Sequence, residues 1–126
     1  MRNRSAVIFA GAAAAATTLA LSGGAAVAEG VTAPQKVTVT MTDFKFKLTK
    51  ASRVVKTLKA GKTTFTMLNK GKSIHDFDIV KVKNGPFIAP GKRGKYTVTL
   101  KKGTWRYICT VPRHVALGMS GKLVVK

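Results

Sequence analysis

Residues 109–119, CTVPRHVALGM, hold most of the side chains in this chain that could bind a metal or carry redox chemistry. They include the only cysteine, Cys109, one of the two histidines, His114, and one of the four methionines, Met119. The other histidine, His75, lies earlier, in NKGKSIHDFDI. A trigonal set of one thiolate and two imidazoles, with a weakly bound thioether, suits a copper ion that cycles between Cu(I) and Cu(II). The sequence therefore predicts a copper site formed by these four side chains.

Each of these four residues, taken alone, also has a structural explanation. A lone buried cysteine usually behaves as a small hydrophobic residue, and methionine commonly fills gaps in a core. A histidine at the start of a strand is often a hydrogen-bonded structural residue. The joint pattern is more specific, because both histidines, the only cysteine and a suitably spaced methionine form one ligand set. Zinc binding and a site that has lost its metal remain the alternatives.

The elements that must position these donors have the period-two pattern of β-strands. Residues 36–42, KVTVTMT, alternate apolar and polar side chains, and residues 43–48, DFKFKL, place two phenylalanines and a leucine opposite two lysines. Similar runs begin at residues 63, 74, 95, 103 and 121. The segments KAGK, NKGK, KNGP, APGKRGK and KKG separate them and are typical of turns. Only SRVVKTLK, from residue 52, fits either a strand or a short helix.

Seven or eight short strands without a convincing amphipathic helix predict an all-β fold, an antiparallel β-sandwich. In such a sandwich Cys109 ends a strand, the chain turns at Pro112, and the same loop returns His114 and Met119 to one end of the molecule. His75 reaches that end from a distant strand. The lysines of DFKFKL face water, and Trp105 and Tyr107, which share the face of the cysteine, belong to the core.

The first residues have the three parts of a secretory signal peptide. Arg2 and Arg4 precede the uncharged run 6–21, and small residues follow up to AVA at 26–28. A membrane anchor is the alternative, but the apolar run is shorter than the roughly 20 residues that span a bilayer. We therefore expect a cleaved signal peptide at residues 1–28 and one domain at 29–126, exported to the periplasm, the cell envelope or the medium.

The chain is strongly basic, with 23 lysines and arginines, four acidic residues and a net charge of +19. Such a charge suits nucleic acid, anionic lipid, an anionic wall polymer or an acidic protein, and it is also compatible with a merely solvated surface. The predicted export and the lack of a recognisable nucleic-acid-binding motif argue against nucleic acid. We expect a monomer with acidic protein partners, and peripheral association with an anionic membrane or wall as a further interaction.

YICTVPRHVALGM and NKGKSIHDFDI resemble the two ligand-bearing segments of the cupredoxins, the plastocyanin/azurin family of type 1 (blue) copper proteins. The resemblance covers roughly residues 35–126. It implies a Greek-key β-sandwich, one type 1 copper per chain, and electron transfer between larger redox proteins. It assigns His75, Cys109 and His114 as the strong ligands and Met119 as the axial ligand.

Two residues depart from the common family pattern. Asp76 follows the first histidine, where family members commonly have asparagine. Its carboxylate can accept a hydrogen bond from Thr110, and its negative charge near copper favours Cu(II) and lowers the reduction potential. Arg113, between Pro112 and His114, replaces a frequent glycine and puts a fixed charge beside the ligand expected nearest to solvent.

The four donors leave no open metal position for a substrate, and no nucleophile has a spare base, so we do not expect an enzyme. The predicted function is that of an exported one-electron carrier. The alternatives are copper sequestration or delivery in the envelope, and a basic envelope-binding module with an incidental site. The family resemblance implies that partners dock near His114. The expected apolar surface consists of Pro112, Val115, Ala116 and Leu117, with Pro86 and Phe87 nearby, and the expected basic rim consists of Lys92, Arg93 and Lys95.

Overall fold

The computed structural model of the protein describes residues 33–126. The predicted signal peptide, residues 1–28, and the first residues of the predicted exported domain lie outside this range. Over the described range the chain contains β-strands, turns and irregular segments but no α-helix. It therefore also has no helix of the length and apolar character needed to cross a membrane.

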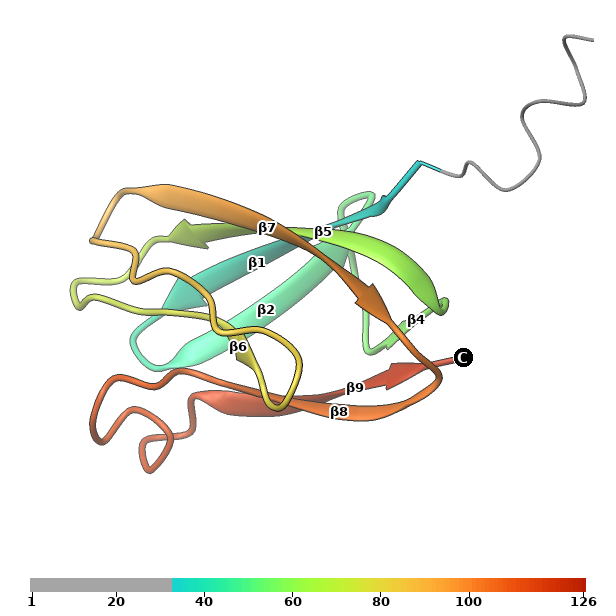
Figure 1. The fold of residues 1–126 in the computed structure, drawn as a ribbon. Coiled ribbons are helices and arrows are strands. Elements are labelled where there is room, and N and C mark those ends of the chain that lie inside the picture. Colours follow the sequence, from blue (N-terminus) through green and yellow to red (C-terminus); the bar gives the residue numbers. More distant parts are fainter. Residues whose placement is uncertain (1–32) are drawn as a thin grey trace, which may run out of the picture. The chain divides into compact units, whose positions relative to one another are not determined.

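Nine strands form two sheets, which Figure 1 shows stacked as the two layers of a sandwich. The first sheet has five strands in the order β3-β2-β1-β5-β7, and the second has four in the order β4-β9-β8-β6. The strands are β1 (Gln35–Thr42), β2 (Lys45–Lys50), β3 (Arg53–Val54), β4 (Thr57–Leu58), β5 (Gly61–Asn69), β6 (Asp78–Ile79), β7 (Arg93–Leu100), β8 (Gly103–Ile108) and β9 (Ser120–Val125). The predicted all-β sandwich is confirmed, and three of its nine strands are only two residues long.

The direction of pairing differs from the prediction in two places. The pairs β1–β5 and β4–β9 are parallel, whereas the remaining pairs are antiparallel. A period of two determines which face a side chain takes, but it carries no information on the direction of the neighbouring strand. The parallel pairs arise because the chain between β2 and β5 crosses from one sheet to the other and back.

The segment of uncertain character, SRVVKTLK, makes this crossing. It forms no helix. Its first part is β3, which pairs with β2, and its second part is β4, which pairs with β9 of the other sheet. Lys126 accepts a hydrogen bond from the backbone N–H of Ala60 at 2.8 Å, so the crossing is held at the end of the sandwich where the chain terminates.

The predicted faces of the long strands are confirmed. Val37 pairs with Phe65 and Val39 with Met67 across β1 and β5, and all four side chains are buried. In β2, Leu48 is buried while its lysines at 45 and 47 are exposed. Two further predicted core residues, Trp105 and Tyr107, are only partly buried against the core.

One predicted strand, residues 74–82, is mostly irregular, and only β6 within it is a strand. Its side chains explain the difference, because two of its carboxylates accept backbone N–H groups that a neighbouring strand would otherwise bind. Asp76 accepts a hydrogen bond from the backbone N–H of Thr110, and Asp78 accepts one from that of Gly85. Isolated antiparallel β-bridges pair His75 with Ile88 and Ile79 with Lys83. The segment is thus held by buried polar groups as well as by pairing.

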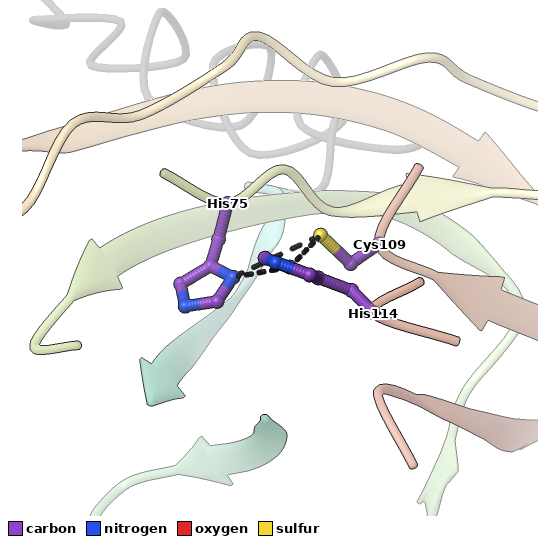
Figure 2. A group of neighbouring side chains, drawn as sticks. All are labelled: His75, Cys109 and His114. Carbon is purple, nitrogen blue, oxygen red and sulfur yellow. Dashed lines mark hydrogen bonds between the residues drawn. The ribbon is translucent and has the colours of Figure 1, made fainter. Parts of the chain in front are cut away.

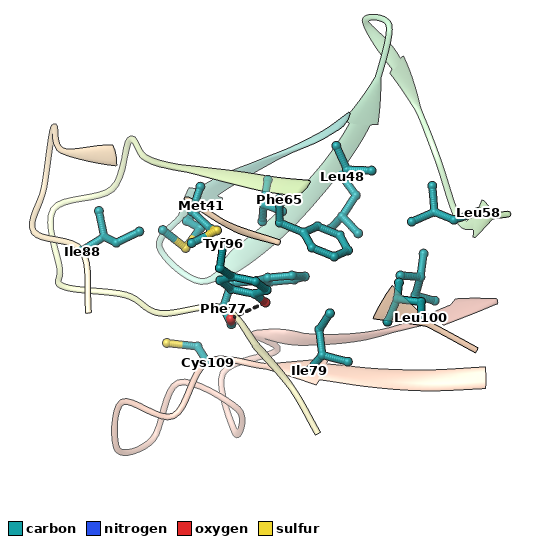
Figure 3. Packing of buried hydrophobic residues seen from close by; sticks show 14 of the residues in the cluster. Met41, Leu48, Leu58, Phe65, Phe77, Ile79, Ile88, Tyr96, Leu100 and Cys109 are labelled. Atoms are coloured by element: carbon teal, nitrogen blue, oxygen red, sulfur yellow. Dashed lines mark hydrogen bonds between the residues drawn. The ribbon is translucent and has the colours of Figure 1, made fainter. Parts of the chain in front are cut away.

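An aromatic cluster fills the centre of the sandwich beside this segment (Figure 3). Phe77 has no exposed surface, and its ring lies 5.3 Å from those of Phe46 and Phe65. Its carbonyl accepts a hydrogen bond from the hydroxyl of Tyr96 at 2.9 Å. Figure 3 shows Cys109 at the edge of this cluster. The sulfur therefore rests on a closely packed core, which limits its movement.

Asp78 makes the stability of the fold depend on pH. Its side chain is 7% exposed, and burial raises the pKa of this carboxyl; the hydrogen bond from Gly85 opposes that shift and the charge of Asp76 adds to it. The folded protein therefore binds this proton more tightly than the unfolded chain. The stabilising contribution is complete below the unfolded-state pKa and is lost as the pH rises through the folded-state pKa.

We predict that Asp78→Asn raises the free energy of unfolding at pH 7, because it keeps an oxygen acceptor for Gly85 and removes the buried charge. At pH 3, where Asp78 is protonated in both states of the parent, the gain should disappear. Urea denaturation of parent and variant at both values measures the difference. A variant less stable than the parent at pH 7 would show instead that the ionised Asp78 stabilises the fold.

Candidate metal centre

Three predicted donors meet at one end of the sandwich (Figure 2). His75 precedes β6, Cys109 directly follows β8, and His114 lies in the loop between β8 and β9. The Nδ1 atoms of the histidines are 3.1 Å apart, and the Cys109 Sγ lies 3.5 Å from Nδ1 of His114 and 3.9 Å from Nδ1 of His75. All three side chains are buried, and the same ring nitrogen of each histidine faces the sulfur.

This triangle has the size that a metal ion requires. The point equidistant from its three corners lies about 2.0 Å from each, against about 2.0–2.1 Å for a zinc–nitrogen bond and about 2.3 Å for a zinc–sulfur bond. A first-row metal ion therefore fits among the three atoms after a small outward movement of the sulfur. Thiolate and two imidazoles in one plane are also the equatorial donors that type 1 copper uses.

The loop between β8 and β9 folds back tightly and returns the fourth candidate to the sulfur. Cys109 donates its backbone N–H to the carbonyl of Met119 at 3.2 Å, and Met119 donates its own to the carbonyl of His114 at 3.0 Å. The side chain of Met119 is fully buried. Three of the four predicted donors thus meet directly, and the fourth is joined to two of them through the backbone of one loop.

Arg113 takes the left-handed backbone conformation within this loop, with φ of 72°. Such a conformation costs a non-glycine residue roughly 1–2 kcal/mol. Glycine takes this conformation without that cost. The side chain of Arg113 is exposed, so its charge lies at the surface next to His114.

Burial controls the protonation of the donors. It raises the pKa of the Cys109 thiol to about 11, so the thiol keeps its proton at neutral pH when no metal is present. Burial, followed by the neighbouring His75, lowers the pKa of His114, which keeps that imidazole neutral. A metal entering the site has to displace the thiol proton, whereas the His114 imidazole is already uncharged.

Asp76 joins the two segments that carry the donors, as the sequence led us to expect. Its Oδ1 accepts the backbone N–H of Thr110 at 2.6 Å, and its Oδ2 accepts the Thr110 hydroxyl. Since Asp76 follows His75 and Thr110 follows Cys109, these bonds hold the two donors in register across a gap of 34 residues.

The turn between β1 and β2 contributes a third segment, which the sequence reasoning missed. The ring of Phe44 packs edge-on against His114, with centroids 4.7 Å apart, and against His75 at 6.2 Å. Oδ1 of Asp43 lies 2.7 Å from Nε2 of His75. Asp43 carried no recognisable signal in the sequence, because a lone acid in a turn is ordinary. Only its contact with a candidate ligand marks it.

His114 is the donor nearest to solvent. It is 7% exposed, whereas His75 and Cys109 have no exposed surface. Some large apolar side chains are exposed in the loop that carries His114 and in the segments around His75 and its partner Ile88. They are Phe87, at 62%, Leu117, at 57%, and Val115, at 36%, all predicted, and Ile74, at 44%, which was not predicted.

Comparison with known proteins agrees with this architecture. The family described as the cupredoxin-like domain matches residues 7–125 of the chain. Rusticyanin from Acidithiobacillus ferrooxidans is 39% identical over 83 residues, which cover 50% of this chain and 52% of that protein. The chain therefore spans about half the length of rusticyanin.

Solved structures share the fold at low sequence identity. Auracyanin from Roseiflexus castenholzii superposes with a TM-score of 0.61 at 18% identity, over 75% of this chain and 99% of its own. Auracyanin A from Chloroflexus aurantiacus superposes with a TM-score of 0.57 at 22% sequence identity, over 75% of this chain and 100% of its own. Copper nitrite reductase from Nitrosomonas europaea superposes with a TM-score of 0.57 at 24% sequence identity, over 75% of this chain and 42% of its own.

The resemblance drawn from the two ligand segments is thereby confirmed at the level of the family. A match over nearly the whole chain, a two-sheet sandwich and a buried triangle of two imidazoles and a thiol all agree. The chain belongs to the cupredoxin-like family, and its donor set is that of a type 1 copper centre.

Proposed function

We propose that this protein is a small type 1 copper protein that carries single electrons between redox partners after export. The observation that carries the proposal is the convergence of Nδ1 of His75, Nδ1 of His114 and Sγ of Cys109 on one point. In this assignment these three residues are the strong ligands, and Met119 is the weak axial ligand. Auracyanin A, which shares the fold, is a "blue" copper protein, and this agrees with the assignment.

Copper bound here would supply reversible one-electron transfer between Cu(I) and Cu(II). The chain's own residues hold the donors still and keep water away. Cys109 rests on the aromatic core, His75 is paired with Ile88 in both directions at 3.2 and 2.7 Å, and Asp76 fixes the loop after the sulfur. Rigid donors leave little rearrangement between the two oxidation states, which favours fast transfer.

Burial of the donors favours this function over copper delivery. A protein that hands copper to a partner must let the partner's ligands reach the metal. Here His75, Cys109 and Met119 have no exposed surface. Electrons can pass through the edge of His114, whereas a metal ion would need the loop to open.

The surface around His114 suits brief docking of an acidic partner. The exposed apolar side chains of Phe87, Val115 and Leu117 form its centre in this proposal, and Arg113 adds a positive charge. Lys92, Arg93 and Lys95 are exposed and form the proposed rim. Such rim charges speed encounter more than they strengthen a complex. The remaining positive surface would also allow loose association with an anionic membrane or wall.

We predict that Cu(II) gives the protein an intense visible absorption band, because the Cys109 thiolate can transfer charge to the metal. Cys109→Ser should abolish the band, and His75→Ala should weaken copper binding at least roughly tenfold. Absorption spectra and chelator competition measure both effects, and near-ultraviolet circular dichroism tests that each variant is folded. A serine variant as strongly coloured as the parent would refute the copper–thiolate assignment.

Met119 should tune the metal more than hold it, because a long axial thioether contributes little to binding. We predict that Met119→Gln lowers the reduction potential, since an oxygen donor favours Cu(II), and that Met119→Leu raises it. Voltammetry of the copper-loaded proteins measures both. Met67→Leu, a change at a buried methionine of β5, serves as the matched control and should leave the potential unchanged. Equal potentials in all four proteins would exclude Met119 as the axial ligand.

Docking through the basic rim predicts a salt-dependent rate. Screening acts over about 8 Å at physiological ionic strength, so the rate of electron transfer with an acidic partner should fall as salt is added. Arg113→Glu should slow transfer further at low salt without changing the visible spectrum. Lys59→Glu makes the same change in charge at the opposite end of the sandwich and should have a smaller effect. Stopped-flow oxidation across a salt series measures the rate of electron transfer. A rate that stays constant or rises with salt concentration would contradict docking by charge.

A further inference from the structure

We propose that Asp43 is a positioning residue of the metal centre, which holds His75 in one tautomer and orientation and lowers the reduction potential through its charge. The redox part of this inference depends on the proposed function, whereas the positioning part concerns the protein without metal. The contact that carries it is the 2.7 Å distance between Oδ1 of Asp43 and Nε2 of His75.

The two nitrogens of His75 face different surroundings. Nδ1 points to Sγ of Cys109 and Nδ1 of His114, whereas Nε2 points to the carboxylate. An ionised carboxylate only accepts hydrogen bonds, so Nε2 must carry the proton that it donates. In neutral His75 the lone pair is then on Nδ1, toward the metal position. A carboxylate that fixes a ligand histidine in this way also raises the basicity of the metal-binding nitrogen.

Asp43 is itself held in place by a neighbouring loop. Its Oδ2 accepts the backbone N–H of Lys72 at 2.9 Å, and its Oδ1 accepts that of Ser73 at 3.2 Å. The hydrogen bond from Lys72 is the largest influence and lowers the pKa of Asp43; burial, the next largest, opposes it, and the bonds from His75 and Ser73 lower it further. The carboxylate thus has three donors around it and cannot rotate away without breaking these bonds.

The loop that holds Asp43 is built for this close approach. Gly71 has no side chain, and a Cβ there would collide with the Asp43 carboxylate and lie 3.0 Å from Nε2 of His75. Buried Asn69 braces the loop by donating to the carbonyls of Ser73 and Ile88, at 2.8 and 2.7 Å, and by accepting the backbone N–H of Gly71. An adventitious surface contact would not need such support.

The arrangement makes the two histidines unequal. Within residues 33–126, the hydrogen-bond contacts of the His114 ring involve Nδ1 alone, and the ring packs against Phe44. The negative charge therefore acts on the metal through His75. It should stabilise Cu(II) more than Cu(I), because the ion with the higher charge gains more from a basic ligand and a nearby anion.

Two variants of the full-length protein separate charge from orientation. Asp43→Asn keeps an oxygen acceptor and removes the charge, and Asp43→Ala removes both. Asp78→Asn removes a charge from the residue that pairs with Ile108, next to Cys109, without touching a donor, and is the matched control. The tautomer of His75 is read in the metal-free protein from the ¹⁵N shifts of its ring, Cu(II) affinity from chelator competition, and the potential from voltammetry.

We expect Asp43→Asn to keep the proton on Nε2 and to raise the potential more than Asp78→Asn does. Asp43→Ala should give a mixture of tautomers and lower the Cu(II) affinity by about 10- to 100-fold, the usual effect of losing such a partner. An alanine variant that keeps both the tautomer and the affinity of the parent would overturn the positioning role. An asparagine variant that shifts the potential no more than the control would overturn the charge effect. If the parent itself forms no coloured copper centre, the proposed function fails, but the tautomer measurement still tests the positioning role.

Discussion

The structure depends on the placement of one sulfur atom between two imidazole nitrogens in a region from which water is excluded. An unligated thiol and two imidazole rings gain little from lying 3.1 to 3.9 Å apart, and their burial has a cost in lost hydration. The surrounding fold must therefore hold them there. It does so by joining three segments that are far apart in the sequence: the turn after β1, the segment before β6, and the loop between β8 and β9.

Carboxylates connect these segments to one another and to the loop that follows β6. Asp43 holds the loop at Lys72 and Ser73, Asp76 holds Thr110, and Asp78 holds Gly85. Each accepts a backbone N–H from a different part of the chain, and two of the three are almost fully buried. Bonds of this kind are stronger than neutral ones, because the acceptor is charged. They give rigidity where the strand ladder is interrupted.

This use of the acids also explains the surface. In residues 33–126 the carboxylates of Asp43, Asp76 and Asp78 accept backbone hydrogen bonds, and none of them forms an ion pair with a lysine or arginine of that range. Every lysine and arginine of that range is exposed except Lys50, which is half-buried. Positive charge is therefore not neutralised locally, and it acts over distance on anything acidic that approaches. The same three acidic residues therefore have two effects. They hold the segments that carry the metal donors, and they leave the basic surface residues of the described range without an ion-pair partner there.

The sequence by itself determined the donor types, the faces of the long strands and the fold class. These are local properties: the spacing of Cys109, His114 and Met119 lies within one loop, and the burial of Val37 and Val39 follows from alternation along β1. The expected hydrogen bond between Asp76 and Thr110 is also present, because the family resemblance supplied this contact between distant residues. Only the tertiary structure decided the rest. It showed that β1 pairs with β5 in parallel, that residues 74–82 are mostly irregular, and that Asp43 reaches His75 across 32 residues. Strand direction and loop contacts depend on how distant segments cross, and alternation of side chains is the same in either direction. The sequence could name the atoms that would bind a metal. Which carboxylate holds them in position depends on where the chain folds back on itself.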